Sequence, residues 1–251
     1  MQIRTLLSAT IVTAVVLASC TTESDNVIFV RQVMAPPTNT GTGCTYTADP
    51  AQPAISSGTL DLGVTNTYSA QMLVGSNIQR QGTAGVKAES ASVIIQGAFV
   101  EVLDGSDAVI REAFTTFASG FIDPSSGGNP SFGLAGAQLV DTKAADAIKA
   151  RVTAANGPVT VRARIRVFGR TVVDTYVESG PFDFPIVACV GCLVSFPADS
   201  VDPAKQAAEG KTNCSAALKA GTTTAIPCSA GQDQVLDCRL CQGLDICDPS
   251  K

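Results

Sequence analysis

The sequence predicts a mainly β fold: an antiparallel β-sandwich with one crossover helix and a disulfide-rich C-terminal cap. Short runs of alternating apolar and polar residues recur from residue 59 to residue 196, with turn-forming residues between them. Helical periodicity occurs once, between residues 142 and 156. Seven of the nine cysteines lie between Cys189 and Cys247, in a polar region too short to build a core without covalent support.

Eight segments are expected to form strands because side chains of like polarity recur at every second position. Their ranges are 59–64, 67–74, 91–103, 109–117, 132–140, 159–168, 171–177 and 189–196. The sequence Asp104-Gly105-Ser106-Asp107 predicts a hairpin turn, and Gly97 predicts a bulge inside the longest run. Residues 123–130 lack periodicity and are expected to form an exposed loop.

The expected helix at 142–156 has one apolar face, formed by Ala145, Ile148 and Val152. Gly157-Pro158 stops its propagation. Because the helix interrupts the series of strands, it is expected to cross between two edges of the sheet.

The strand expected at 159–168 has one apolar face and one cationic face. The cationic row consists of Arg162, Arg164, Arg166 and Arg170. Burial of the apolar residues in the next strand requires a hairpin longer than two residues, which places Arg164 opposite Asp174 and Arg162 opposite Tyr176. The other two arginines are then less compensated. The row is a candidate contact for carboxylates or phosphates, and the alternative is a solvated face balanced by acidic residues.

Residues 1–19 carry one charge, Arg4, and an apolar run too short to span a bilayer, which is typical of an export signal. The sequence Leu17-Ala18-Ser19-Cys20 resembles the lipobox of bacterial lipoproteins at all four positions. The resemblance implies that residues 1–19 are removed and that the Cys20 sulfur receives a lipid, a reaction that requires a thiol nucleophile. Thr21 in place of Asp implies sorting to the outer membrane. The alternative is an ordinary secretory signal.

With Cys20 assigned to lipid, an even number of cysteines remains, which predicts four disulfides in an oxidising compartment. The candidates are Cys44, Cys189, Cys192, Cys214, Cys228, Cys238, Cys241 and Cys247. Cys44 is expected to tie the N-terminal segment to the far end of the body, because its possible partners lie at least 145 residues away. The spacing leaves the connectivity open.

Two other uses of the Cys-x-x-Cys pairs at 189–192 and 238–241 are less favoured. A zinc site would need both pairs, and the gap between them is too wide for the usual spacing. A redox-active pair usually opens a helix that lowers a thiol pKa, and neither pair does so. We expect no metal and no cofactor.

The chain is therefore expected to have four parts. These are a signal peptide at 1–19, a lipid-anchored tether at 20–57, a β-sandwich domain at 58–196 and a cysteine-rich cap at 197–251. In this layout the chain resembles the uncharacterised cysteine-rich lipoproteins of Gram-negative envelopes, a resemblance that implies location and not mechanism.

Composition excludes several functions. The chain has no His, which excludes Ser-His-Asp and Cys-His catalysis and His-ligated metals. With 17 Lys plus Arg against 22 Asp plus Glu, it has no basic surplus for binding nucleic acid. Gly210-Lys211-Thr212 does not complete a phosphate loop, because residue 205 is Lys where Gly is required.

These observations favour a non-enzymatic, lipid-anchored structural or interaction module of the outer membrane, with other envelope proteins or polysaccharide as partners. An alternative is a binding domain for an anionic polymer or a glycan. A second alternative is a hydrolase, which would require two carboxylates that converge in a cleft.

Overall fold

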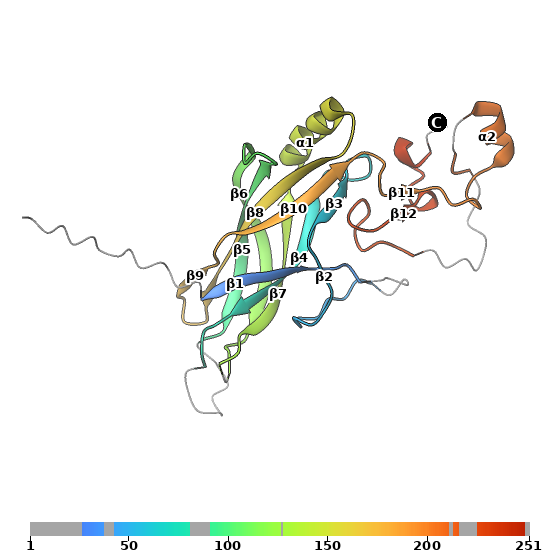
Figure 1. Cartoon of the computed structure of the whole chain (residues 1–251). Helices are drawn as coiled ribbons and strands as arrows, with labels where there is room; N and C mark the ends of the chain where they lie inside the picture. Colours follow the sequence, from blue (N-terminus) through green and yellow to red (C-terminus); the bar gives the residue numbers. More distant parts are fainter. Residues whose placement is uncertain are drawn as a thin grey trace, which may run out of the picture.

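The computed structural model describes residues 27–37, 43–80, 91–126, 128–210, 213–215 and 225–248. The expected signal peptide at 1–19 and the lipid site Cys20 lie outside these residues. Within them the protein is mainly β, as the alternating pattern predicts (Figure 1). The described part of the chain has no helix with the length and apolar character needed to cross a bilayer.

Ten strands form one mixed sheet. They are β1 (Ile28–Met34), β2 (Ala54–Ile55), β3 (Gly58–Asp61), β4 (Tyr68–Ser76), β5 (Val93–Asp104), β6 (Val109–Ile122), β7 (Ser131–Val140), β8 (Val159–Thr171), β9 (Tyr176–Glu178) and β10 (Phe182–Cys189). Their order is β2-β1-β4-β7-β6-β5-β8-β10-β3, with β9 paired to β8. Neighbouring strands are antiparallel except β10 and β3, which are parallel.

The sheet curls into a nearly closed barrel, whereas the sequence predicted a sandwich of two antiparallel sheets (Figure 1). A parallel bridge joins Ile28 of β1 to Ser179, which follows β9, so distant strands of the sheet meet. Glycines at the β6–β7 contact allow the bend. A Cβ atom at Gly120 would collide with the carbonyl of Leu134, and one at Gly133 would collide with the carbonyl of Phe121.

The core fills the inside of the barrel with residues from nearly all of its strands. The largest fully buried side chains are Tyr68, Phe184, Ile28, Leu60, Met72, Leu73, Leu103, Ile122, Leu139, Ile148, Ile165 and Ile186. Helix α1 (Thr142–Ala155) covers one end and buries Ala145, Ile148 and Val152, which confirms the expected helix and its apolar face. It joins β7 to β8, which are both interior strands, so the expected crossing between sheet edges is wrong. Asp141 caps its start by accepting from the Ala144 N–H.

Several local predictions are confirmed. The Asp104 carboxylate accepts from the backbone N–H groups of Ser106 and Ala108, which closes the β5–β6 turn. A hydrogen bond from the Ser106 hydroxyl, followed by these two backbone bonds, lowers the pKa of Asp104. The pairing register shifts at Gly97, where the ring of Phe168 occupies the space that a Cβ atom would need.

Other predictions are wrong. Residues 28–34, expected within the tether, form β1, because their apolar residues pair with β4. Strand β10 replaces the strand expected at 189–196. Strand β10 was not predicted because it contains Pro185, which lacks a backbone N–H. At Pro185 only β8 is paired with the strand, since pairing with β3 begins at Ile186, so the missing N–H is tolerated. The loop expected at 123–130 is mostly exposed, as predicted, but it buries Ser125, whose backbone forms hydrogen bonds with the backbones of Ile78 and Arg80.

The C-terminal segment packs against one side of the barrel (Figure 1). Its described elements are α2 (Pro203–Glu209), β11 (Val194–Ser195) paired with β12 (Leu236–Asp237), and two short 3-10 helices at Cys238–Leu240 and Asp245–Cys247. Helix α2 was not predicted, since the sequence indicated a single helix, at 142–156. The carboxylate of Asp233 accepts from the Thr59 N–H and from the buried Tyr68 hydroxyl, each at 2.7 Å. Burial raises the pKa of Asp233 and of Tyr68.

Four disulfides join all eight of the cysteines that the sequence assigns to bridges. The pairs are Cys44–Cys228, Cys189–Cys192, Cys214–Cys238 and Cys241–Cys247. The first spans 184 residues and ties the N-terminal segment to the C-terminal one, which confirms the role expected for Cys44. Buried Cys214, Cys238 and Cys247 form the centre of a small second core.

The long-range disulfide should stabilise the fold far more than the short one. In the chain-entropy model, its loop stabilises the folded state by about 5 kcal/mol, and the four-residue Cys189–Cys192 loop by about 2 kcal/mol. Urea unfolding of the Cys44→Ala/Cys228→Ala variant should therefore show the larger loss of unfolding free energy. The matched control is Cys189→Ala/Cys192→Ala, and equal losses would contradict the expectation.

Candidate functional site

A shallow groove lies over strands β4, β6 and β7, with a cavity volume of about 610 Å³. That volume is within the usual range for small-molecule and oligomer sites. One wall is the Cys44–Cys228 disulfide, so covalent bonding across the chain fixes the shape of the groove. The lining residues are uncharged: Cys44, Tyr46, Ser69, Ala70, Gln71, Thr115, Thr116, Phe117, Gly136, Ala137, Gln138, Cys228 and Ser229.

The pleat of two neighbouring strands places the polar side chains of the groove. Ser69 lies opposite Gln138, and Gln71 lies opposite Gly136, in the antiparallel pairing of β4 with β7. Because outward residues alternate with inward ones, Ser69 and Gln71 share the outer face, while Tyr68 and Met72 are buried. A Cβ atom at Gly136 would collide with the Gln71 amide oxygen, so this glycine makes room for the glutamine.

The groove offers hydrogen-bonding groups and aromatic surface without charge. In the part of the chain that the structure describes, the amides of Gln71 and Gln138 make no hydrogen bond within the protein, so both can donate to and accept from a ligand. Burial, followed by the charge of Asp233, raises the pKa of Tyr46, whose hydroxyl stays protonated. The side chain of Phe117 lies at the edge of the groove and is 79% exposed.

The arginine row does not contribute free positive charge. Arg164 lies between Glu101 of β5 and Asp183 of β10, with nitrogen–oxygen distances of 3.7 and 3.0 Å. Its hydrogen bond with Asp183 raises the pKa of Arg164. The other pairs are Arg162 with Asp107 and Asp183, Arg166 with Glu178, and Arg170 with Asp174. Each arginine therefore faces at least one carboxylate.

The partners differ from those predicted. Arg164 is opposite Asp183 and Glu101 instead of Asp174, and Tyr176 lies opposite Arg170 instead of Arg162. The reason is that β8 is an interior strand with β5 and β10 on its sides, and β9 pairs only with its last residues. The hairpin is longer than two residues, as predicted, and Val177 is buried. The two arginines expected to be less compensated are both paired.

An aromatic stack accompanies the row on the outer face. The ring centroids of Phe99 and Phe168 are 4.7 Å apart, and those of Phe168 and Tyr176 are 6.3 Å apart. The Arg166 guanidinium lies 5.3 Å from the centroid of Phe99. Burial, together with a hydrogen bond from the Tyr176 hydroxyl to Glu178, raises the pKa of Tyr176 to about 12. The three rings, the Arg166 guanidinium and the Tyr176 hydroxyl therefore all have partners within the protein.

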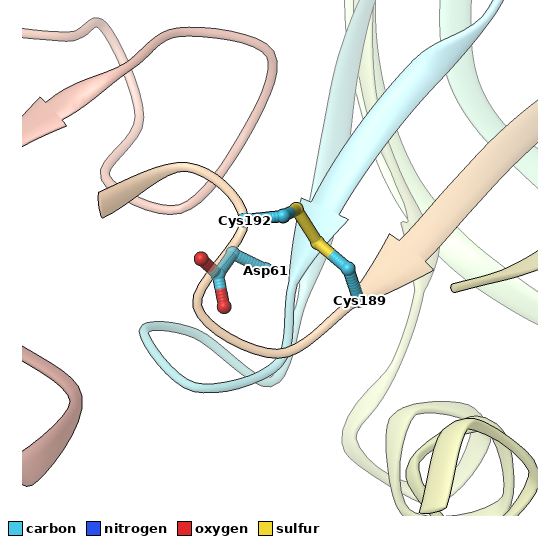
Figure 2. Close-up of side chains that lie close together, drawn as sticks. All are labelled: Asp61, Cys189 and Cys192. Carbon is cyan, nitrogen blue, oxygen red and sulfur yellow. A yellow bond between two sulfur atoms is a disulfide. The ribbon is translucent and has the colours of Figure 1, made fainter. Parts of the chain in front are cut away.

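A third cluster joins Asp61 to the Cys189–Cys192 disulfide. Figure 2 shows the Asp61 carboxylate enclosed by the turn between the two cysteines. It accepts from the backbone N–H groups of Gly63, Gly191 and Leu193 at 2.7 to 2.9 Å, so its oxygens are committed to holding the turn. The two sulfurs are bonded to each other and the carboxylate is engaged by three backbone N–H groups, so these side chains stabilise the turn in this structure.

The groove is the site that sequence reasoning missed. Only its Cys44 and Cys228 were singled out, and as bridge partners. Gln71 and Gln138 lie in expected strands, and their outward position follows from the alternation, but their meeting depends on pairing between strands that are distant in sequence. The lipidation candidate Cys20 lies outside the described residues.

Comparisons with known proteins do not assign the chain to a family. No family model matches it, and no curated protein matches it. A crystal structure of a protein from Archaeoglobus fulgidus is similar in part, with 9% identity over 49% of this chain and 86% of that chain, at a TM-score of 0.29. A likeness at this level carries no argument about fold or function.

Because the arginines are paired, the row should not bind polyanions. The Arg162→Ser/Arg164→Ser/Arg166→Ser variant should show the same retention on a polyanionic resin at physiological salt as the natural protein. Its unfolding free energy should fall only slightly for Arg164 and Arg166, because solvent screens exposed ion pairs. Strong retention of the natural protein, abolished in the variant, would instead establish the row as an anion site.

Proposed function

We propose that this protein is a lipid-anchored binding module of the outer membrane, held through Cys20, which binds an uncharged glycan in the groove over β4, β6 and β7. The single observation that carries the ligand class is the groove's lining: two amides without internal partners, several hydroxyls and an exposed ring, with no charged residue. Sugar hydroxyls match the amides of Gln71 and Gln138, and the ring of Phe117 offers a stacking surface.

The other candidate functions find less support. An anionic polymer would need free cationic groups, and the four arginines of the row are engaged with carboxylates. A hydrolase would need two carboxylates at the ligand, and the groove lining contains none. Binding without catalysis therefore agrees best with the residues present.

The location rests on two features that support each other. The Leu17-Ala18-Ser19-Cys20 sequence resembles a lipobox, and the remaining cysteines are all paired in disulfides, which persist in oxidising compartments. A chain whose other eight cysteines are joined to one another is consistent with lipidation at Cys20. The outer membrane is proposed because the residue after Cys20 is Thr21 and not Asp.

Affinity electrophoresis tests the ligand class. Gels that contain soluble α-glucan, β-glucan or mannan should retard the natural protein, and gels that contain alginate should not. Phe117→Ala should weaken the binding roughly tenfold, as expected for a lost aromatic contact worth about 1–1.5 kcal/mol. The matched control is Phe121→Ala, also an exposed ring on β6 but outside the groove lining.

Retardation by alginate alone, or equal binding by the Phe117→Ala and natural proteins, would show that the groove does not bind a neutral glycan. The Gln138→Ala variant provides an independent check, because it removes an amide and leaves the ring in place.

A further inference from the structure

The end of the barrel at the β8–β9 turn carries an apolar surface that the fold does not explain. Residues 172–175 form the turn, and its first two residues, Val172 and Val173, are 46% and 62% exposed. Turns in water are usually built from Gly, Pro, Asn, Asp and Ser. Here only Asp174, with a positive φ of 70°, follows that rule.

The apolar surface continues across the adjacent strands. Phe121 of β6 lies opposite Ile94 of β5, Ile94 lies opposite Arg170 of β8, and Arg170 lies opposite Tyr176 of β9. We call the exposed apolar members of this set the rim patch: Ile94, Phe121, Val172, Val173 and Tyr176. These groups surround the Arg170–Asp174 ion pair, and exposed apolar patches bordered by polar residues mark contact with another protein or with a membrane.

The path of the chain brings this end close to the proposed anchor. Ile28 of β1 forms a parallel bridge with Ser179, three residues beyond Tyr176. Because the bridge is parallel, the chain enters β1 from the side on which the β8–β9 turn lies. Cys20 precedes Ile28 by eight residues, and a fully extended chain of that length spans at most about 28 Å. Figure 1 shows β9 and the start of β1 at one end of the barrel and α1 at the other.

We infer that the rim patch rests in the headgroup region of the bilayer that holds the acyl chains of Cys20, so that the barrel has two membrane contacts. This inference rests on the proposed lipid anchor. The order of residues from the turn upward suits such a position: Val172 and Val173 reach the acyl boundary, while Tyr176 and Arg170 lie at the level of the headgroups. Arg170 keeps its carboxylate partner, Asp174.

This orientation directs the binding groove away from the membrane. Ser69 and Gln71 lie near the start of β4, whereas the end of that strand, Ser76, pairs with Ile28 at the anchor end. The β4 and β7 parts of the groove therefore lie toward the end of the barrel remote from the rim patch, and Phe117 on β6 lies four residues from Phe121. A glycan in it would not compete with lipid headgroups for the same surface.

The test uses the full lipidated protein in vesicles of phosphatidylethanolamine and phosphatidylglycerol. Val173→Cys introduces one unpaired thiol, which can be labelled without reduction with a fluorophore whose emission reports polarity. The matched control is Ala154→Cys on α1, also exposed, beyond the opposite end of β8, a strand of 13 residues that spans about 40 Å.

The label at residue 173 should shift to shorter emission wavelength on vesicle binding, resist quenching by aqueous iodide and be quenched by a lipid-borne quencher. The label at residue 154 should remain fully accessible to iodide. Adding Val172→Asp should reverse the shift at residue 173, because an unpaired charge opposes insertion of the turn, whereas the Asp174 carboxylate is paired with Arg170.

The outcomes separate the two proposals. If the protein floats with the vesicles and both labels are equally accessible to iodide, the rim patch does not contact the bilayer and the anchor stands. If the protein does not float with the vesicles, the lipid anchor is wrong, and the second contact fails with it.

Discussion

The covalent bond between Cys44 and Cys228 is the constraint on which the rest of the structure depends. It joins segments 184 residues apart and forms one wall of the groove. The neighbouring Asp233 contributes by bonding to Thr59 and to the hydroxyl of Tyr68, a side chain in the barrel core. A polar C-terminal segment with few apolar residues is held in this way on a barrel that supplies the hydrophobic core. Such bonds persist in oxidising compartments, which supports the proposed export.

The distribution of charge explains why the groove is favoured over the arginine row. On the outer face of β8, four arginines alternate with carboxylates from β5, β9, β10 and two turns, so the row is balanced within the protein. The groove over β4 and β7 contains no charge and keeps its amides available. A surface that satisfies its own charges stabilises the sheet, and a surface with unpartnered polar groups can bind.

Local pattern was sufficient to predict helix α1 and the turn after Asp104, because each depends on residues close in sequence. The bulge at Gly97 was predicted from the glycine alone, although the ring that occupies its side-chain space comes from β8. Local pattern did not predict β10, since Pro185 is allowed in a strand only where one side lacks a partner, and that depends on where β3 begins. Nor did it predict the barrel, whose closure requires Ile28 and Ser179 to meet.

The same distinction applies to the site. The sequence identified Cys44 and Cys228 by count and compartment, but Gln71 and Gln138 are ordinary outward residues until the β4–β7 register places them over one hollow. The alternation of residues in the sequence identified the arginine row. The sequence did not predict that the row is neutralised, because the carboxylate partners come from strands on both sides of β8.

The intact mass of the protein isolated from membranes tests the central claim most directly. A chain that begins at Cys20, carries diacylglycerol and an N-acyl group, and gains alkyl groups on eight cysteines only after reduction is the predicted result. A chain that retains residues 1–19 without added lipid, or that alkylates at these cysteines before reduction, would contradict the location and the fold's dependence on it.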